Sequence, residues 1–254
     1  MHALCYRSWA SWLLGNPSAA LADLDRALSD AREFAQAATL MNALAITTCI
    51  SILCRNYTAA NAQIDELFTM AQEKGTTYWE AFGTWLRGWL FAVTGKAAES
   101  VLMLTSGIQA WRSTGATLFT PTQLSCLASA HAQLGQFDEA WRCIVDATST
   151  VDASKEKWFE AEVYRTAGEI ALKSPQPDEA KAEAHFERAL AVSRKQQAKS
   201  WELRAAMSMA RLSRDQGKTQ QARGLLAPVY SWFTEGFDTR DLKEAKALLD
   251  ELAQ

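Results

Sequence analysis

The sequence predicts an all-α protein built as an α-solenoid, a right-handed superhelix of stacked antiparallel helix pairs. First, one motif recurs about every 40 residues along the 254-residue chain, and a fixed period of this length is typical of repeat architectures. Second, 48% of the residues are hydrophobic while there are only 5 prolines and 12 glycines, which favours long helices. Third, apolar residues within each segment recur three and four positions apart, which is the spacing of one helix face.

The recurring motif starts at a turn and continues into the second helix of each pair. Gly15, Gly95, Gly135 and Gly217 mark this turn, and Arg55 stands at the corresponding place in the second unit. A small residue follows, and a larger apolar residue comes four positions later. The small residues are Ala20, Ala60, Ser100, Ala140, Ala182 and Ala222, and the larger ones are Leu24, Ile64, Leu104, Ile144, Phe186 and Leu226. Small residues let two helices approach closely, and the larger residues fill the space between them.

The first three units each contain two predicted helices. The pairs span residues 2–14 and 17–35, then 38–54 and 57–74, then 78–94 and 97–115. Pro17 suits the first turn of its helix, where a missing N–H costs least, and Gly75 is a good helix end. Gly107 lies inside a helix, where glycine costs about 1 kcal/mol relative to alanine. We therefore expect a close helix approach at Gly107.

The last three units follow the same plan. Their first helices begin near Pro121, near Trp158 and before Ala206. A longer turn at 174–178, with two prolines, accounts for a two-residue shift in the repeat. Residues 238–253 form a last amphipathic helix with a charged outer face, as a terminal cap requires. The predicted single domain, 1–254, divides into units at about 1–36, 37–76, 77–116, 117–154, 155–197 and 198–236, with a cap at 237–254.

The composition limits the possible partners. The net charge is −3, so we expect no general affinity for nucleic acid or for anionic membranes. No apolar run is long enough to cross a bilayer. Five cysteines without metal-binding or disulfide spacing suit a reducing cytoplasm. Residues 1–154 are poor in charge, with 9 basic and 13 acidic side chains against 17 and 16 in residues 155–254; such a surface suggests self-association as one possibility.

Two groups of residues are candidates for ligand binding. The repeat described above resembles the tetratricopeptide repeat, and this resemblance implies that the first helix of each unit lines the concave face. On that face the first group forms an aromatic half-groove, which could hold an amphipathic helix or stack a small ring. Its residues are Trp9, Trp12, Cys49, Phe82, Trp85, Trp89, Ser125 and Ser129. The alternative is that Trp85 and Trp89 pack inside the core, and the sequence leaves both interpretations open.

The second group is charged and lies in the fifth and sixth units. It contains Arg165 and Glu169, with Arg204 and Arg211 on the next unit. Arg204 and Arg211 are seven residues apart and share one helix face. An acidic peptide or a phosphate could dock there, and the alternative is a solvated face of mixed charge.

The chain contains none of the common catalytic motifs. It has no P-loop, no H-E-x-x-H and no G-x-S-x-G sequence, and its three histidines fall in different units. We therefore expect a protein that is not an enzyme and that has no cofactor and no metal site.

The repeat resembles the tetratricopeptide repeat family, whose standard unit is near 34 residues. Segments at 182–190 (AEAHFERAL), 196–206 (QQAKSWELRAA), 225–230 (LLAPVY) and 233–239 (FTEGFDT) resemble the C-terminal repeat region of bacterial predicted ATPases. In those proteins the repeats are fused to an adenylate/guanylate cyclase domain or to a winged-helix domain. The resemblance implies that catalysis or DNA binding lies on an upstream part.

Together these observations predict a non-enzymatic, cytoplasmic module for protein–protein interaction and regulation. It would belong to a larger bacterial signalling ATPase, cyclase or transcription regulator. Its partner would be a protein, a peptide or the upstream domains of its own full-length chain. The alternatives are a small-molecule effector sensor that uses the tryptophan-lined groove, and a homo-oligomerisation module.

Overall fold

The computed structural model describes residues 2–253, and in this range the chain forms thirteen α-helices and no strand. Met1, in the first predicted unit, and Gln254, at the end of the predicted cap, lie outside the described residues. The helices are α1 (His2–Leu13), α2 (Pro17–Glu33), α3 (Ala37–Leu53), α4 (Tyr57–Lys74), α5 (Thr77–Val93), α6 (Ala97–Ser113), α7 (Thr120–Gln133), α8 (Phe137–Ser154), α9 (Glu160–Lys173), α10 (Glu179–Gln196), α11 (Lys199–Asp215), α12 (Thr219–Ser231) and α13 (Arg240–Glu251).

The recurring small and large residues pack each helix pair together. All six small residues of the motif are fully buried, and their larger partners are buried as well. Gly107 of α6 lies against the backbone of Trp85 on α5, where an added Cβ would come within 2.8 Å of the Trp85 nitrogen. The expectation of a close helix approach at Gly107 is confirmed. The all-α solenoid predicted from the repeat is confirmed too.

Five of the six turns between paired helices use a left-handed residue, and the longer turn between α9 and α10 does not. Gly95 and Gly135 have φ values of 82° and 74°, and Arg55 adopts the same region with φ 57°. A left-handed residue ends a helix without leaving its last carbonyls unpaired. Most units have glycine at this turn, whereas the second unit has Arg55. The turn therefore carries a side chain, which lines a pocket described below.

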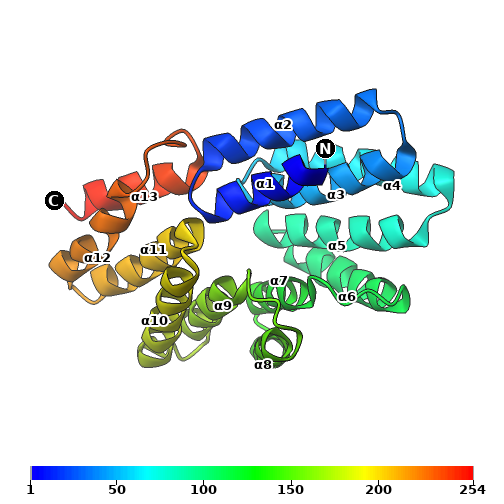
Figure 1. The fold of residues 1–254 in the computed structure, drawn as a ribbon. Coiled ribbons are helices and arrows are strands. Elements are labelled where there is room, and N and C mark those ends of the chain that lie inside the picture. Colours follow the sequence, from blue (N-terminus) through cyan, green and yellow to red (C-terminus); the bar gives the residue numbers. More distant parts are fainter. Residues whose placement is uncertain (1, 254) are drawn as a thin grey trace.

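The odd-numbered helices form an inner ring. Helix α1 contacts α3, and contacts continue from α3 to α5, α7, α9 and α11 before α11 returns to α1. Figure 1 shows the first and last helices beside each other, with α11 and α13 next to α1 and α2. Trp12 and Trp201 meet across this closure with ring centroids 4.6 Å apart, and the Ser200 hydroxyl donates to the Trp12 carbonyl oxygen. The solenoid therefore curls until its ends touch.

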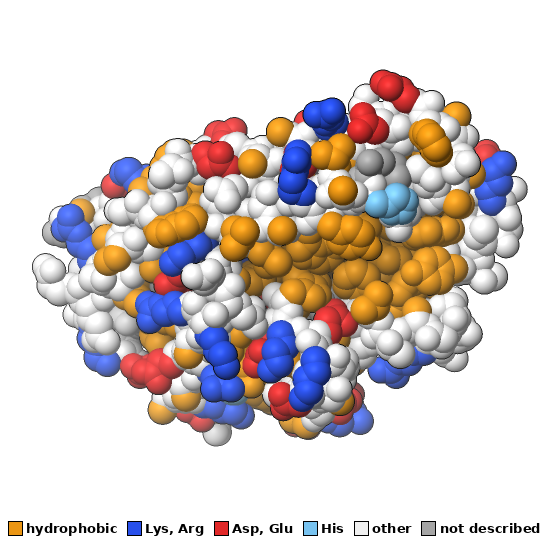
Figure 2. Space-filling view, viewed as in Figure 1, with side chains coloured by type: hydrophobic (Ala, Val, Ile, Leu, Met, Phe, Trp, Pro, Cys, Tyr) orange, Lys and Arg blue, Asp and Glu red, His pale blue; other side chains and the backbone are white. Residues whose placement is uncertain are grey.

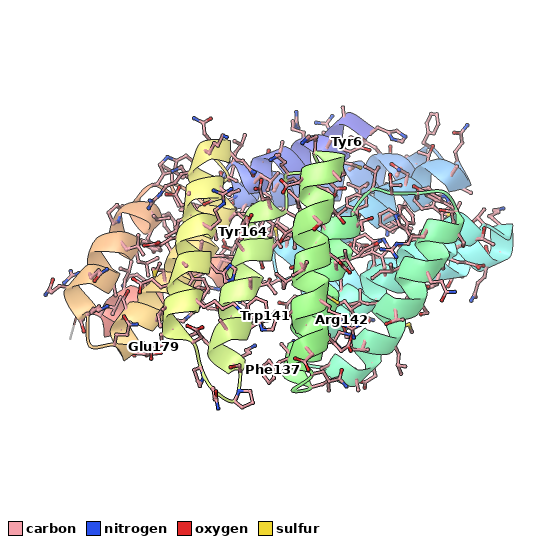
Figure 3. The ribbon with its side chains drawn as sticks, turned by 90° about the horizontal axis from the view of Figure 1, so that it is seen from below. Tyr6, Phe137, Trp141, Arg142, Tyr164 and Glu179 are labelled. Atoms are coloured by element: carbon pink, nitrogen blue, oxygen red, sulfur yellow. The ribbon has the colours of Figure 1, made fainter. Side chains whose placement is uncertain are left out.

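The even-numbered helices cover the outside. Viewed from below, the outer helices α8 and α10 lie on either side of α9, which belongs to the inner ring (Figure 3). The imidazole of His185 on α10 lies 5.8 Å from the ring of Trp141 on α8 and 6.4 Å from that of Tyr164 on α9. These aromatic contacts join neighbouring pairs. None of the described helices is both long and apolar enough to cross a bilayer.

Candidate binding sites at the two ends of the helix ring

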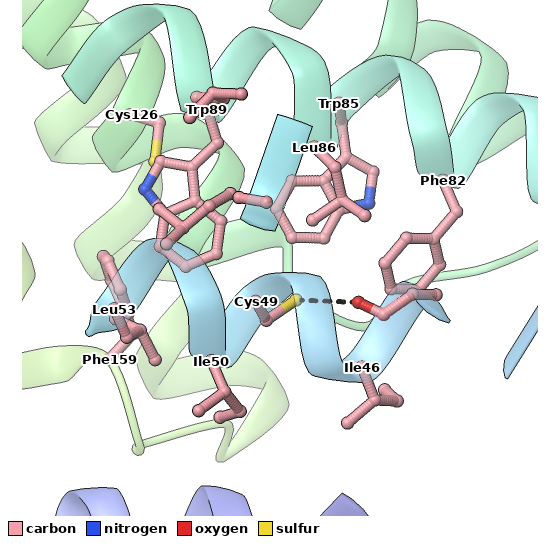
Figure 4. Close-up of a cluster of buried hydrophobic side chains, with 14 of the residues drawn as sticks. Ile46, Cys49, Ile50, Leu53, Phe82, Trp85, Leu86, Trp89, Cys126 and Phe159 are labelled. Atoms are coloured by element: carbon pink, nitrogen blue, oxygen red, sulfur yellow. Dashed lines mark hydrogen bonds between the residues drawn. The ribbon is translucent and has the colours of Figure 1, made fainter. Parts of the chain in front are cut away.

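The centre of the ring is filled by an aromatic cluster made of Phe82, Trp85, Trp89, Phe119 and Phe159. The Trp85 and Trp89 rings stack with centroids 5.7 Å apart, Phe119 lies 5.6 Å from Trp85, and Phe159 lies 6.1 Å from Trp89. Figure 4 shows Trp85 and Trp89 projecting from α5 toward α3, which carries Cys49. Trp85 has no exposed surface. Much of the predicted half-groove is therefore hydrophobic core, and this central cluster separates two open pockets.

The predicted binding residues are divided among the core and these pockets. Trp9 and Phe82 line one pocket, and Trp89, Arg165, Arg204 and Arg211 line the other. Glu169 pairs with Arg165 at 3.2 Å. Trp12, Cys49, Trp85, Ser125 and Ser129 line neither pocket. The Ser125 hydroxyl donates to Thr166 at 3.3 Å, and Ser129 accepts from Gln133 at 3.4 Å. Ligand binding by all twelve residues stays a prediction.

The first pocket, which we call the arginine pocket, encloses about 250 Å³ near the C-terminal ends of α3 and α5. Five arginines line it, together with a single carboxylate, that of Glu162, and several aromatic side chains. The arginines are Arg55, Arg165, Arg204, Arg211 and Arg240. They come from the turn after α3, from α9, from α11 and from α13, so the pocket exists only because the ring closes.

Carboxylates just outside the arginine pocket hold these guanidinium groups in place. Asp241 lies 2.9 Å from Arg55 and 2.7 Å from Arg204, whereas Glu244 is shared by Arg55, Arg211 and Arg240. The Arg211 contact is long, at 3.8 Å. Burial lowers the pKa of Arg204, but Asp241 and Glu162 outweigh it and hold that pKa above its ordinary value. Arg204 therefore stays protonated, and the five arginines exceed by one charge the four carboxylates that pair with them, which are Glu162, Glu169, Asp241 and Glu244.

Arg211 and Arg240 are the arginines best able to take a ligand. Their side chains are 41% and 57% exposed, whereas Arg204 is 10% exposed. Both share one carboxylate, Glu244, with a third arginine. A guanidinium presents a planar fork of donors that fits a carboxylate or a phosphate. The geometry therefore suits an anionic group placed between α11 and the start of α13.

The second pocket, which we call the aromatic pocket, encloses about 380 Å³ near the N-terminal ends of α3 and α5. Its aromatic lining residues are Tyr6, Trp9, Tyr78, Trp79, Phe82, Phe119 and Trp158. In Figure 2, hydrophobic side chains gather in a hollow on the face where α1 lies in front. Glu156 supplies a carboxylate to its wall. A volume in this range is typical of small-molecule sites.

The sequence patterns did not indicate several of these lining residues. Phe119, Glu156 and Trp158 come from the segments between α6 and α7 and between α8 and α9, which carry no repeat motif. Arg55 and Arg240 come from a turn and from the cap. The sequence signal that could have indicated the aromatic pocket is the presence of an aromatic residue in each of two successive segments between units. Residues 2–253 contain no group of three or more His, Cys, Asp or Glu that could hold a metal ion.

Comparison with known proteins supports the fold. No family model matches the chain, and no curated protein matches it. Among solved structures, the apo form of RapI is similar with a TM-score of 0.64 and 16% identity, over 98% of this chain and 83% of that one. BtubC (BKLC) from P. vanneervenii has a TM-score of 0.57 and 17% identity, over 90% of this chain and 90% of that one. The apo form of the quorum sensor NprR from B. thuringiensis has a TM-score of 0.56 and 12% identity, over 99% of this chain and 80% of that one. The chain has a tetratricopeptide-like helical-repeat fold, and at these identities the likeness shows the fold alone.

Proposed function

We propose that the chain is a non-enzymatic regulatory module that binds an acidic segment of a protein or peptide partner in the arginine pocket. The observation that carries the proposal is the set of five arginines that four chain segments bring to one cavity. Likeness to a quorum sensor, NprR, supports a regulatory role. The upstream domains of a larger bacterial signalling ATPase, cyclase or transcription regulator are one source of such a segment.

The charge balance around the pocket favours an anionic ligand. Glu244 pairs with three arginines, Arg55, Arg211 and Arg240. One carboxylate therefore faces three guanidinium groups, although Asp241 also pairs with Arg55. A ligand carboxylate can take up the donors of Arg211 and Arg240 without breaking the more buried pair of Arg204 with Asp241. Ion pairs with side chains as exposed as these contribute about 0.2–1 kcal/mol each. Neighbouring Trp89 and Met207 offer apolar contact beside the charge.

The test is a selection from a random peptide library on the full chain, followed by affinity measurements on the selected peptides by fluorescence anisotropy. We expect peptides with Asp, Glu or a free carboxylate at fixed positions. Replacing Arg211 and Arg240 together by alanine should weaken their binding by about tenfold or more, which is about 1.4 kcal/mol.

The matched control is Arg142→Ala, because Arg142 is 70% exposed on α8 and, among residues 2–253, pairs only with its neighbour Glu139. This variant should bind the peptides as the unchanged protein does. Selected peptides without acidic character, or equal affinity for the double variant, would contradict the proposal. Nucleotide hydrolysis by the purified chain would contradict the non-enzymatic role.

A second candidate function is a small-molecule effector sensor. The observation that favours it is the aromatic pocket, which has the volume and the apolar lining of a ligand site. It lies away from the arginine pocket, across the central aromatic cluster. The two functions can therefore be tested with separate variants.

A further inference from the structure

The aromatic pocket contains one carboxylate, that of Glu156, in an unusual setting. Glu156 follows the end of α8, and its carboxylate accepts from the backbone N–H of Phe119 at 2.9 Å and from the indole N–H of Trp158 at 2.9 Å. Phe119 has φ 66°, a left-handed conformation that is strained for a bulky residue. Glu156 thus holds Phe119 and Trp158, two walls of the pocket, in place. A carboxylate has about four acceptor positions, so it retains the capacity to accept from a ligand.

The described surroundings of Glu156 do not balance its charge. None of the described residues that line the aromatic pocket has a basic side chain. Glu156 forms no ion pair with another described residue, while its neighbour Lys157 pairs with Glu160. Burial raises the pKa of Glu156, and the hydrogen bonds from Trp158 and Phe119 lower it by less. An ionised carboxylate without a cation in an apolar wall is costly, and a positively charged ligand would relieve that cost.

The walls of the aromatic pocket suit a cation equally well. The Trp9 ring stacks on Phe119 with centroids 5.7 Å apart and meets Trp158 edge-on at 4.6 Å. Tyr78 and Trp79 meet edge-on at 4.9 Å on α5. Aromatic faces attract an ammonium ion within about 6 Å through their quadrupole. Hydrocarbon attached to the ammonium group would contact Ala10, Leu13 and Ile46, which also line the pocket.

We infer that the aromatic pocket binds a small organic ammonium compound. Its ammonium group would lie at Glu156 beside Phe119 and Trp158, and its hydrocarbon part would lie against Ala10, Leu13 and Ile46. This inference rests on the second candidate function and names its ligand class. It is independent of the arginine pocket, where an anionic segment is proposed. The pocket therefore discriminates by charge as well as by shape.

The test uses 2-phenylethylammonium and its neutral analogue 2-phenylethanol as probes, in ligand-observed NMR titrations of the full chain at pH 7. We expect the ammonium compound to bind at least fivefold more tightly than the alcohol. Glu156→Gln keeps an oxygen that can accept from Trp158 and Phe119 but removes the charge, so the preference should fall to about one. Trp79→Leu, at the partly exposed wall, should weaken both probes.

The matched control is Glu99→Gln, an exposed carboxylate of α6 outside both pockets, which should keep the preference. Circular dichroism would establish that each variant is folded. Equal binding of the two probes to the unchanged protein would overturn the role of Glu156 while leaving a sensor for neutral compounds. Binding of neither probe would overturn the ligand class together with the sensor function. Two further results would assign the pocket to another occupant and also overturn the inference. One is binding of a lysine-containing peptide amide without binding of 2-phenylethylammonium. The other is a dimer of this chain that blocks the binding of 2-phenylethylammonium.

Discussion

Cysteine acts in this protein as a small apolar residue. Cys49 and Cys126 belong to the same buried cluster as Trp85, and Cys49 has no exposed surface. The Cys49 thiol donates a weak hydrogen bond to the carbonyl oxygen of Ala45 at 3.5 Å (Figure 4). Such a thiol is packed and protonated, so it lacks the thiolate character that reactive cysteines need.

We predict that the five free thiols react slowly in the folded protein. Burial raises the pKa of every one of them, to about 12 for Cys54 and about 11 for Cys143. A colorimetric thiol reagent at pH 8 should therefore show five slow thiols in the native state and five fast ones in denaturant. One thiol that reacts at once in the native protein would contradict this.

The same shifts predict that stability falls at alkaline pH. The ordinary pKa of a cysteine thiol is 9.0. Above this pH the unfolded thiols release protons that the folded thiols keep. The unfolded state is then favoured, by about 1 kcal/mol at pH 9.5 for each of the buried residues Cys49 and Cys126. Urea unfolding at pH 7.5 and 9.5 would measure this loss. Cys126→Ala should have a smaller pH dependence than the unchanged protein, and an equal dependence would count against the explanation.

At the scale of the elements, the two helices of a pair are held together where small residues let their backbones come close. Gly88 of α5 leaves room for Leu104 of α6, and Gly107 of α6 lies against Trp85. The Ser100 hydroxyl donates to the Gly88 carbonyl oxygen at 2.8 Å, which satisfies a polar group inside this contact. A side chain larger than hydrogen at Gly107 must push the two helices apart.

We predict that Gly107→Ala lowers the free energy of unfolding by about 1–3 kcal/mol, because overpacking outweighs the gain in helix propensity. The matched control is Gly224→Ala in α12, where an added Cβ would meet nothing within 4 Å. That variant should be more stable by about 0.5–1 kcal/mol. Urea denaturation of both would check the pair. Stabilisation of both variants would show that α5 and α6 can separate at little cost.

The helices could be predicted from the sequence because their signals are local. The predicted helix at 57–74 is α4, Tyr57–Lys74, and the cap predicted from Asp238 begins at Arg240. The interior of the ring could not be predicted, since the spacing of tryptophans on one face does not reveal the curvature that brings Trp85 under Phe119. The pockets depend on contacts between distant residues, such as Arg204 with the Leu53 carbonyl oxygen, 151 positions apart.

At the scale of the whole molecule, closure converts a stack of neighbours into a ring. In an open solenoid each unit contacts only adjacent units, and unfolding can begin at either end. In this chain the end segments are joined: Glu235 accepts from the backbone of Ala19, Pro17 packs on Gly236, and Arg55 pairs with Asp241. The arginine pocket lies beside this junction, so a ligand there would bridge the second unit, through Arg55, to α11 and α13.

Asp241 is the residue through which closure can be tested. Its side chain is 13% exposed and pairs with Arg55 from the second unit and with Arg204 of α11. We predict that Asp241→Asn lowers the free energy of unfolding by about 2–3 kcal/mol, because two guanidinium groups lose their carboxylate. Asp250→Asn on the same helix removes an exposed pair with Lys246 and should cost about 0.5 kcal/mol or less. Hydrogen exchange should accelerate in both α1 and α13 of Asp241→Asn, because the ends support each other. Acceleration confined to α13 would mean that the ends are energetically independent.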